Sequence, residues 1–130
     1  MAGTTLTTRL PEWLEEEIRE EFEQRGEGPS EGLRRVVQEW WILTRLTLIE
    51  IREGVTGPRP ALKGGPEVWE VILVRRWYEN DPKGLRDYFG GLTEEQLRQA
   101  LACYELFPEP VDEHLREIDR LNELHEAGLL

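Results

Sequence analysis

The chain has 130 residues, a formal net charge of -11 and a pI near 4.7, with 38% apolar and 33% charged residues. This length suits one domain or two small modules, and five tryptophans supply large apolar side chains that disordered chains usually lack. The acidic balance excludes broad, non-specific affinity for nucleic acid, so any DNA binding must come from a local patch.

Other protein classes are excluded by particular stretches of the sequence. Charged and amide side chains interrupt the most apolar stretch, residues 36–51, so we expect no membrane-spanning segment. The N-terminus lacks a basic start followed by an apolar run, so we expect no secretory signal and a cytoplasmic location. Cys103 is the single cysteine, which excludes an intrachain disulfide and a four-cysteine zinc site.

The opening residues predict a strand and then a helix. Residues 4–10 alternate and are rich in β-branched side chains, which is typical of a short strand. Pro11 and the glutamates after it favour a helix start. The apolar face of this helix consists of Leu14, Ile18 and Phe22, and its end is marked by Gly26 and Gly28.

A second helix is expected after this turn. Ser30 is predicted to be its N-cap. Its predicted buried side consists of Leu33, Val36, Val37, Trp40 and Trp41. We assign residues 1–43 to one module for dimerisation and DNA binding.

Residues 44–66 are expected to connect this module to the rest of the chain. The stretch 44–52 fits either a β-strand or an extension of the second helix. Closely spaced glycines and prolines between residues 54 and 66 predict turns and loops, and they mark the best candidate domain boundary.

Residues 67–130 predict helices throughout. Apolar spacing indicates one helix near 68–77, a short one near 82–89, one that begins at the capping-box pair Thr93 and Gln96, and an acidic one over 111–130. The expected fold is therefore mainly α: a short N-terminal strand that pairs across a dimer, two helices, a small trihelical module and a C-terminal helix.

The N-terminal residues resemble a known DNA-binding family. The run Thr5-Leu6-Thr7-Thr8-Arg9-Leu10-Pro11, the amphipathic helix after it, Gly26 and the run from Ser30 to Val36 resemble a ribbon-helix-helix domain over about residues 4–41. The resemblance implies that two chains pair their strands into an antiparallel ribbon, which enters the major groove of DNA.

Strand geometry then separates two sets of side chains. Leu6, Thr8 and Leu10 share the face toward the helices, because alternate side chains point to opposite faces. Arg can bond guanine, and Thr can contact several bases. The candidate base-reading residues are therefore Thr5, Thr7 and Arg9, and the backbone N–H groups around Ser30 are candidates for holding a phosphate. Alternatively, these residues are the solvated face of a ribbon that only assembles the dimer.

Residues from about 57 to 115 resemble the domain-of-unknown-function family 433, a small helical module with homeodomain-like helices. The run from Leu92 to Tyr104 carries much of the resemblance, whereas Gly64-Gly65-Pro66 stands where that family has a Gly-Thr-Arg turn. The resemblance implies an antitoxin-like component encoded beside a PIN-like nuclease toxin. Glu94 and Glu95, in the first turn of a helix, would repel a DNA backbone, so we expect this helix to have a structural or protein-binding role.

The last helix carries an apolar stripe flanked by acidic residues. One interpretation is that this stripe packs on its own core or on the dimer mate. The other is that it lies in a groove of a basic partner such as a nuclease toxin. The residues concerned are Leu115, Ile118, Leu121 and Leu124.

No catalytic or metal chemistry is indicated by the sequence. His114 and His125 have no further ligands at metal-binding spacing, and His114 is expected on a solvated helix face. The glycine pairs do not form a phosphate-binding loop. We therefore expect no enzyme activity and no cofactor. The leading prediction is a homodimeric DNA-binding antitoxin or transcriptional regulator, and the alternative is a protein-interaction module without DNA binding.

Overall fold

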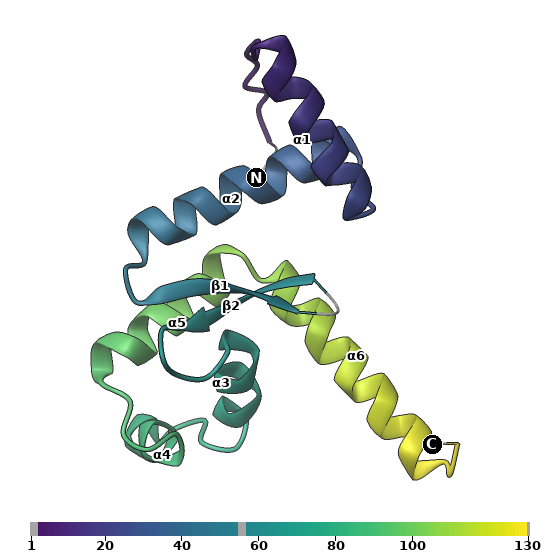
Figure 1. The fold of residues 1–130 in the computed structure, drawn as a ribbon. Helices are drawn as coiled ribbons and strands as arrows, with labels where there is room; N and C mark the ends of the chain where they lie inside the picture. The colour runs from purple at the N-terminus through teal and green to yellow at the C-terminus, as the bar shows by residue number, and fades with distance from the viewer. Residues whose placement is uncertain (1–2, 55–56, 130) are drawn as a thin grey trace. The chain divides into compact units, whose positions relative to one another are not determined.

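The computed structural model describes residues 3–54 and 57–129. Over these residues the fold is mainly helical, with a small two-stranded antiparallel sheet (Figure 1). In chain order the elements are α1 (Glu12–Gln24), α2 (Pro29–Arg45), β1 (Ile49–Gly54), β2 (Gly57–Leu62), α3 (Val68–Arg75), α4 (Pro82–Tyr88), α5 (Glu94–Leu106) and α6 (Glu109–Glu126). The predicted mainly α class is confirmed.

The chain divides into two compact units, and the boundary between them falls inside α2. The N-terminal unit ends at Val37, and the C-terminal unit begins at Gln38. The sheet and helices α3 to α6 belong to the C-terminal unit. Within the Gly- and Pro-rich residues 54–66, residues 57–62 are a strand of the C-terminal unit.

Residues 3–10 form neither helix nor strand within the single chain, and all of them are exposed. A lone strand with no neighbour leaves its backbone groups unpaired, so a ribbon of the predicted kind needs a second chain. The N-terminal strand and its pairing across a dimer therefore stay predictions.

Helix α1 ends at a left-handed glycine, as the sequence indicated. Gly26 has φ of 73°. The N–H of Glu27 donates to the carbonyl of Phe22 at 2.8 Å, and the N–H of Gly26 donates to the carbonyl of Glu23 at 3.0 Å. This pair of bonds is a Schellman motif, which uses the last helical carbonyls and turns the chain toward α2.

Helix α2 begins at Pro29, before the predicted cap. Pro is favoured at the first helical position because its missing N–H has no helical partner there. The N–H of Gly28 donates to the Oε2 atom of Glu31 at 3.3 Å, so the cap position is Gly28. Ser30 lies inside the first turn, and the prediction that it caps the helix is wrong.

Helices α1 and α2 pack together where the Phe22 ring of α1 lies against Gly32 of α2. Phe22 is buried, and a Cβ atom built on Gly32 would lie 2.4 Å from carbons of the Phe22 ring. The guanidinium of Arg35 lies 6.0 Å from the centroid of the same ring, and its Nε atom is 2.8 Å from Oε2 of Glu27. The close approach of α1 and α2 therefore depends on the absence of a side chain at residue 32.

The hairpin β1–β2 resolves the ambiguous stretch after α2. Ile49 pairs with Leu62, Ile51 with Pro60 and Glu53 with Pro58 in an antiparallel register. Residues 49–52 are thus strand, one of the two structures that the sequence allowed.

The prediction of turns and loops over residues 54–66 is wrong for residues 57–62, which form β2. The N–H of Lys63 donates to the carbonyl of Leu48 at 2.9 Å. Backbone groups alternate along an antiparallel strand, so Ala61, Arg59 and Gly57 also direct their N–H and C=O groups toward β1. Pro58 and Pro60 occupy the alternate positions, where no N–H is needed for pairing. This placement explains how two prolines fit in a strand.

The core of the C-terminal unit forms around the end of β2. Helices α3, α5 and α6 pack against this strand. The largest fully buried side chains come from both strands and all three helices, and they are Ile49, Leu62, Val68, Val71, Cys103 and Val111.

Gln99 is a buried polar side chain that joins α5 to the chain just before β1. Its Oε1 atom accepts a hydrogen bond from the N–H of Leu48 at 2.8 Å, and its Nε2 atom donates to Glu95 at 3.1 Å. Both ends of the amide are thus satisfied, as burial of a polar group requires.

Gly32→Ala is predicted to destabilise the N-terminal unit. The new methyl group would overlap the Phe22 ring, so we expect a loss of about 1–3 kcal/mol despite the better helix propensity of Ala. The matched control is Gly28→Ser, because a Cβ at Gly28 meets nothing within 4 Å. This control completes a capping box with Glu31 and should be neutral or stabilising. Urea denaturation followed by circular dichroism measures both, and equal effects would contradict the packing described.

Gln99→Leu is predicted to destabilise the C-terminal unit by about 1–3 kcal/mol, because it leaves the N–H of the half-buried Leu48 without its acceptor. The control is Arg98→Gln on the same helix, where the ion pair with Glu95 is exposed and should contribute little. Chemical denaturation of both variants checks the prediction, which fails if Gln99→Leu matches the native chain.

Candidate nucleic-acid interface

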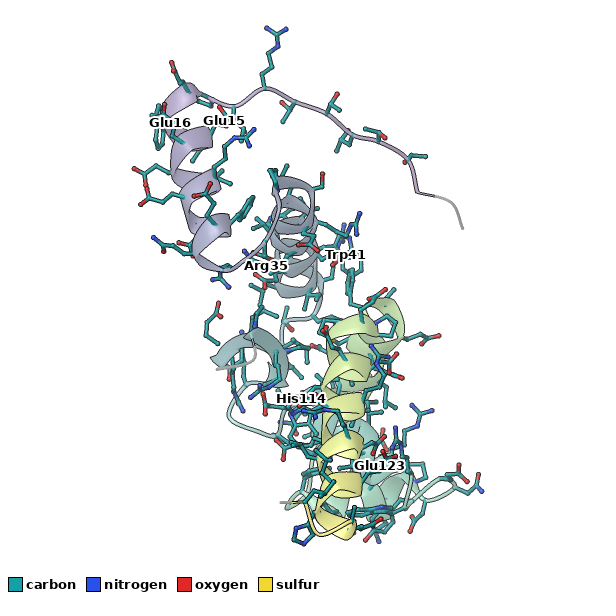
Figure 2. All side chains as sticks on the ribbon, turned by 90° about the vertical axis from the view of Figure 1, so that its right-hand side faces the viewer. Glu15, Glu16, Arg35, Trp41, His114 and Glu123 are labelled. Carbon is teal, nitrogen blue, oxygen red and sulfur yellow. The ribbon has the colours of Figure 1, made fainter. Side chains whose placement is uncertain are left out.

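The predicted base-reading residues lie together at the start of the chain. Thr5, Thr7 and Arg9 are exposed, and Figure 2 shows the residues before α1 as an open trace. Leu6, which alternates with them, is 99% exposed. Within the single chain these side chains therefore contact solvent and are not ordered by strand pairing.

Arg9 is the single charged residue between residues 3 and 10. By contrast, α1 carries seven glutamates, two of which, Glu15 and Glu16, are labelled in Figure 2. A DNA backbone would be repelled by α1 and attracted by Arg9. Between these two segments, the one before α1 is therefore the better candidate for contact with nucleic acid.

Ser30 is exposed in the first turn of α2, where backbone N–H groups attract anions. The carboxylate of Glu31 lies in the same turn and accepts the N–H of Gly28. A phosphate at this end of the helix would thus meet a negative charge already in place. The start of α2 is a weaker candidate for a phosphate contact than the sequence suggested.

A face of α2 remains uncovered. Leu33, Val36 and Val37 are 47%, 44% and 59% exposed, and Trp40 continues the same face one turn later. The prediction that this face is buried is therefore wrong for the single chain, although Trp41 is half-buried. The residues of α2 that are buried are Gly32 and Ile42.

A groove of about 440 Å³ lies between α1 and α2 within the N-terminal unit. Its apolar lining comes from Ile18, Phe22, Leu33 and Val36, and charged side chains of both signs stand at its rim. The groove thus extends the uncovered apolar surface of α2 toward α1.

The stripe of α6 is divided between core and surface. Leu115 is 4% exposed and belongs to the core of the C-terminal unit, so it is not free to contact a partner. Ile118 and Leu124 are half-buried, and Leu121 is exposed. The acidic side of this helix includes the exposed Glu123, labelled in Figure 2. The part of the stripe that is accessible to a partner therefore consists of Ile118, Leu121 and Leu124.

His114 is packed against an aromatic ring, so the expectation of a solvated position is wrong. Its ring lies edge to face with Trp69 at 4.7 Å between centroids. Trp69 donates to Glu67 at 2.8 Å, and Arg59 donates to the same carboxylate at 2.7 Å. Burial of the ring, together with nearby Arg59, lowers the pKa of His114 below 6.5. The cluster joins β2 to α3 and α6 and is structural.

Neither metal binding nor nucleophilic chemistry finds support in the geometry. Among the described residues, no group of three His, Cys, Asp or Glu side chains is placed to hold a metal ion. Burial raises the pKa of the Cys103 thiol to about 12, which leaves it protonated at neutral pH.

Comparison with known proteins gives no relative. No protein-family model, no curated protein and no solved structure matches the chain. The two resemblances drawn from the sequence therefore stay predictions. Among the described helices, none has the length and apolar character needed to cross a membrane.

The depressed pKa of His114 predicts a dependence of stability on pH. The unfolded chain takes up a proton on this imidazole at higher pH than the folded chain, so acidification through pH 6.5 favours unfolding. We expect the native chain to lose more unfolding free energy than His114→Gln between about pH 7.5 and about pH 5.5.

The control for this experiment is His125→Gln, which alters an exposed histidine on the same helix. Its loss of stability over this range should equal that of the native chain. Thermal unfolding at the two pH values gives the comparison, and equal losses in His114→Gln and the native chain would contradict the prediction.

Proposed function

We propose that the chain is a homodimeric DNA-binding regulator of the antitoxin type, in which two N-terminal units form one β-ribbon that enters the major groove. The observation that carries the proposal is the exposure of Leu6 together with the α2 face of Leu33, Val36 and Val37. A soluble chain gains stability when such a surface is covered.

A second copy is the partner that this surface favours. Residues 4–10 have the alternation of a strand, and an antiparallel pair of identical strands satisfies its own backbone groups. In that pair Leu6, Thr8 and Leu10 turn toward the helices, and the exposed face of α2 supplies the apolar surface they need.

The same pairing orients the candidate base readers. When the leucines turn inward, Thr5, Thr7 and Arg9 face outward on both strands, because side chains alternate along a strand. A dimer then presents two arginines and four threonines on one surface. This composition supports contact with base edges, since Arg bonds guanine and Thr bonds bases or packs on the thymine methyl group.

The C-terminal unit is proposed to bind a protein partner. Its α6 combines an acidic surface with the accessible residues Ile118, Leu121 and Leu124. A basic groove would fit this helix by helix-in-groove recognition. The resemblance to antitoxin-like modules favours a nuclease toxin, for which the acidic side chains would compete with the RNA backbone.

A second candidate function is a protein-interaction module whose ribbon only assembles the dimer. The Glu31 carboxylate at the start of α2 favours it, because that charge opposes a phosphate contact. The two functions differ in whether the outward face of the ribbon contacts DNA.

The test is a fluorescence-anisotropy titration of the full chain against DNA from its own upstream region, at two salt concentrations. We predict salt-sensitive binding that Arg9→Ala weakens by about 1–3 kcal/mol. The control is Arg19→Ala, which removes the same charge from α1 and should leave the affinity nearly unchanged. Absence of binding at low salt, by a folded dimer, would reject the DNA function in favour of the interaction module.

A further inference from the structure

The outer edge of β1 carries unpaired backbone groups. The Lys63–Leu48 bond sets the alternation of the backbone N–H and C=O groups along β1. Those of Glu50 and Arg52 point toward β2, and those of Ile49, Ile51 and Glu53 point away from it. The N–H of Ile49 bonds to the carbonyl of Leu46 at 3.0 Å. Among the residues that the structure describes, none pairs with the N–H or the carbonyl of Ile51.

The outer edge of β2 is closed by contrast. Pro58 and Pro60 stand at its outward positions and have no N–H to donate. The next outward N–H, that of Leu62, already bonds to the carbonyl of Pro66 at 2.9 Å. Helices α3, α5 and α6 also pack against β2. The sheet can therefore be extended through β1 and not through β2.

The residues of β1 are complementary to a second β1 that runs the other way. An antiparallel pair centred on Ile51 places Ile51 opposite Ile51 of the other copy, and each Ile51 exchanges two backbone hydrogen bonds. The same register places Glu50 opposite Arg52, twice. Opposite charges in facing positions stabilise a strand pair, whereas like charges destabilise it.

On each face of such a pair, the side chains brought together are compatible. Ile51 shares the sheet face of the deeply buried Ile49, so two half-buried Ile51 side chains would meet on the core side. Glu50 and Arg52 lie on the other face and already form an ion pair at 2.9 Å within one chain. The Arg52 guanidinium also donates to the carbonyls of Leu62 and Gly65, both at 2.9 Å. In the paired sheet, Glu50 of the other copy would stand opposite this fixed positive charge.

We propose that β1 is a self-association edge, through which two copies of this chain join their hairpins into one four-stranded antiparallel sheet of order β2-β1-β1-β2. This contact is independent of the N-terminal ribbon. A chain with two self-complementary surfaces either closes one dimer through both of them or links dimers into larger assemblies.

The test is amide hydrogen exchange of the full chain, measured by NMR at high protein concentration. We expect the Ile51 amide to exchange roughly tenfold or more slowly than an unpaired amide, because it is bonded across the interface. The Arg52 amide, which faces β2 within the chain, is the internal reference for an intact hairpin.

The decisive variant is Glu50→Lys, which places like charges opposite each other twice in the proposed register. We expect it to remove the protection of Ile51 and to leave that of Arg52. The matched control is Glu105→Lys, which makes the same charge change at an exposed position of α5 and should keep Ile51 protected.

Two results would overturn the proposal. One is an Ile51 amide in the native chain that exchanges as fast as an unpaired amide. The other is protection of Ile51 that Glu50→Lys leaves unchanged. Neither result depends on the N-terminal segment, so the failure of this proposal is distinguishable from failure of the proposed ribbon.

Discussion

The apolar face of α2 is exposed in the single chain, and the proposed dimer would cover it. Leu33, Val36 and Val37 are each more than two-fifths exposed, although their spacing along the helix is that of a buried stripe. Gly32, which lies next to this stripe on the helix surface, already admits the Phe22 ring of α1. The helix therefore has one packed face and one face that needs a partner from outside the chain. Residues 3–10 are exposed as well, and their side chains alternate as in a strand.

The C-terminal unit has the opposite character. Its core is complete within one chain: the end of β2 is enclosed by three helices, and the buried amide of Gln99 is bonded at both ends. What this unit offers to partners lies at its margins, namely the open edge of β1 and the accessible part of α6.

Local signals in the sequence were enough to predict most helices. The Thr93–Gln96 capping box is confirmed by hydrogen bonds of 3.0 and 2.8 Å, and the stop at Gly26 is confirmed by its positive φ. These features depend on residues a few positions apart, so the sequence displays them directly.

Features that depend on distant residues could not be predicted. Proline normally argues against a strand, and β2 exists because Pro58 and Pro60 both fall on the outward side, a register set by pairing with β1. The burial of His114 likewise depends on Trp69, which is far away in the chain. For the candidate site, the sequence identified Thr5, Thr7 and Arg9 as one exposed set, but it could not show that an apolar face of α2 is left exposed in the single chain.

Sedimentation equilibrium of the native chain tests most directly the claim that a second copy covers this surface. If a second copy covers it, the chain sediments as a species of at least twice the single-chain mass of 15.2 kDa before any DNA or protein partner is added. A folded chain that sediments at the single-chain mass even at the highest concentration would contradict it, because the exposed face of α2 would then be a stable property of the monomer.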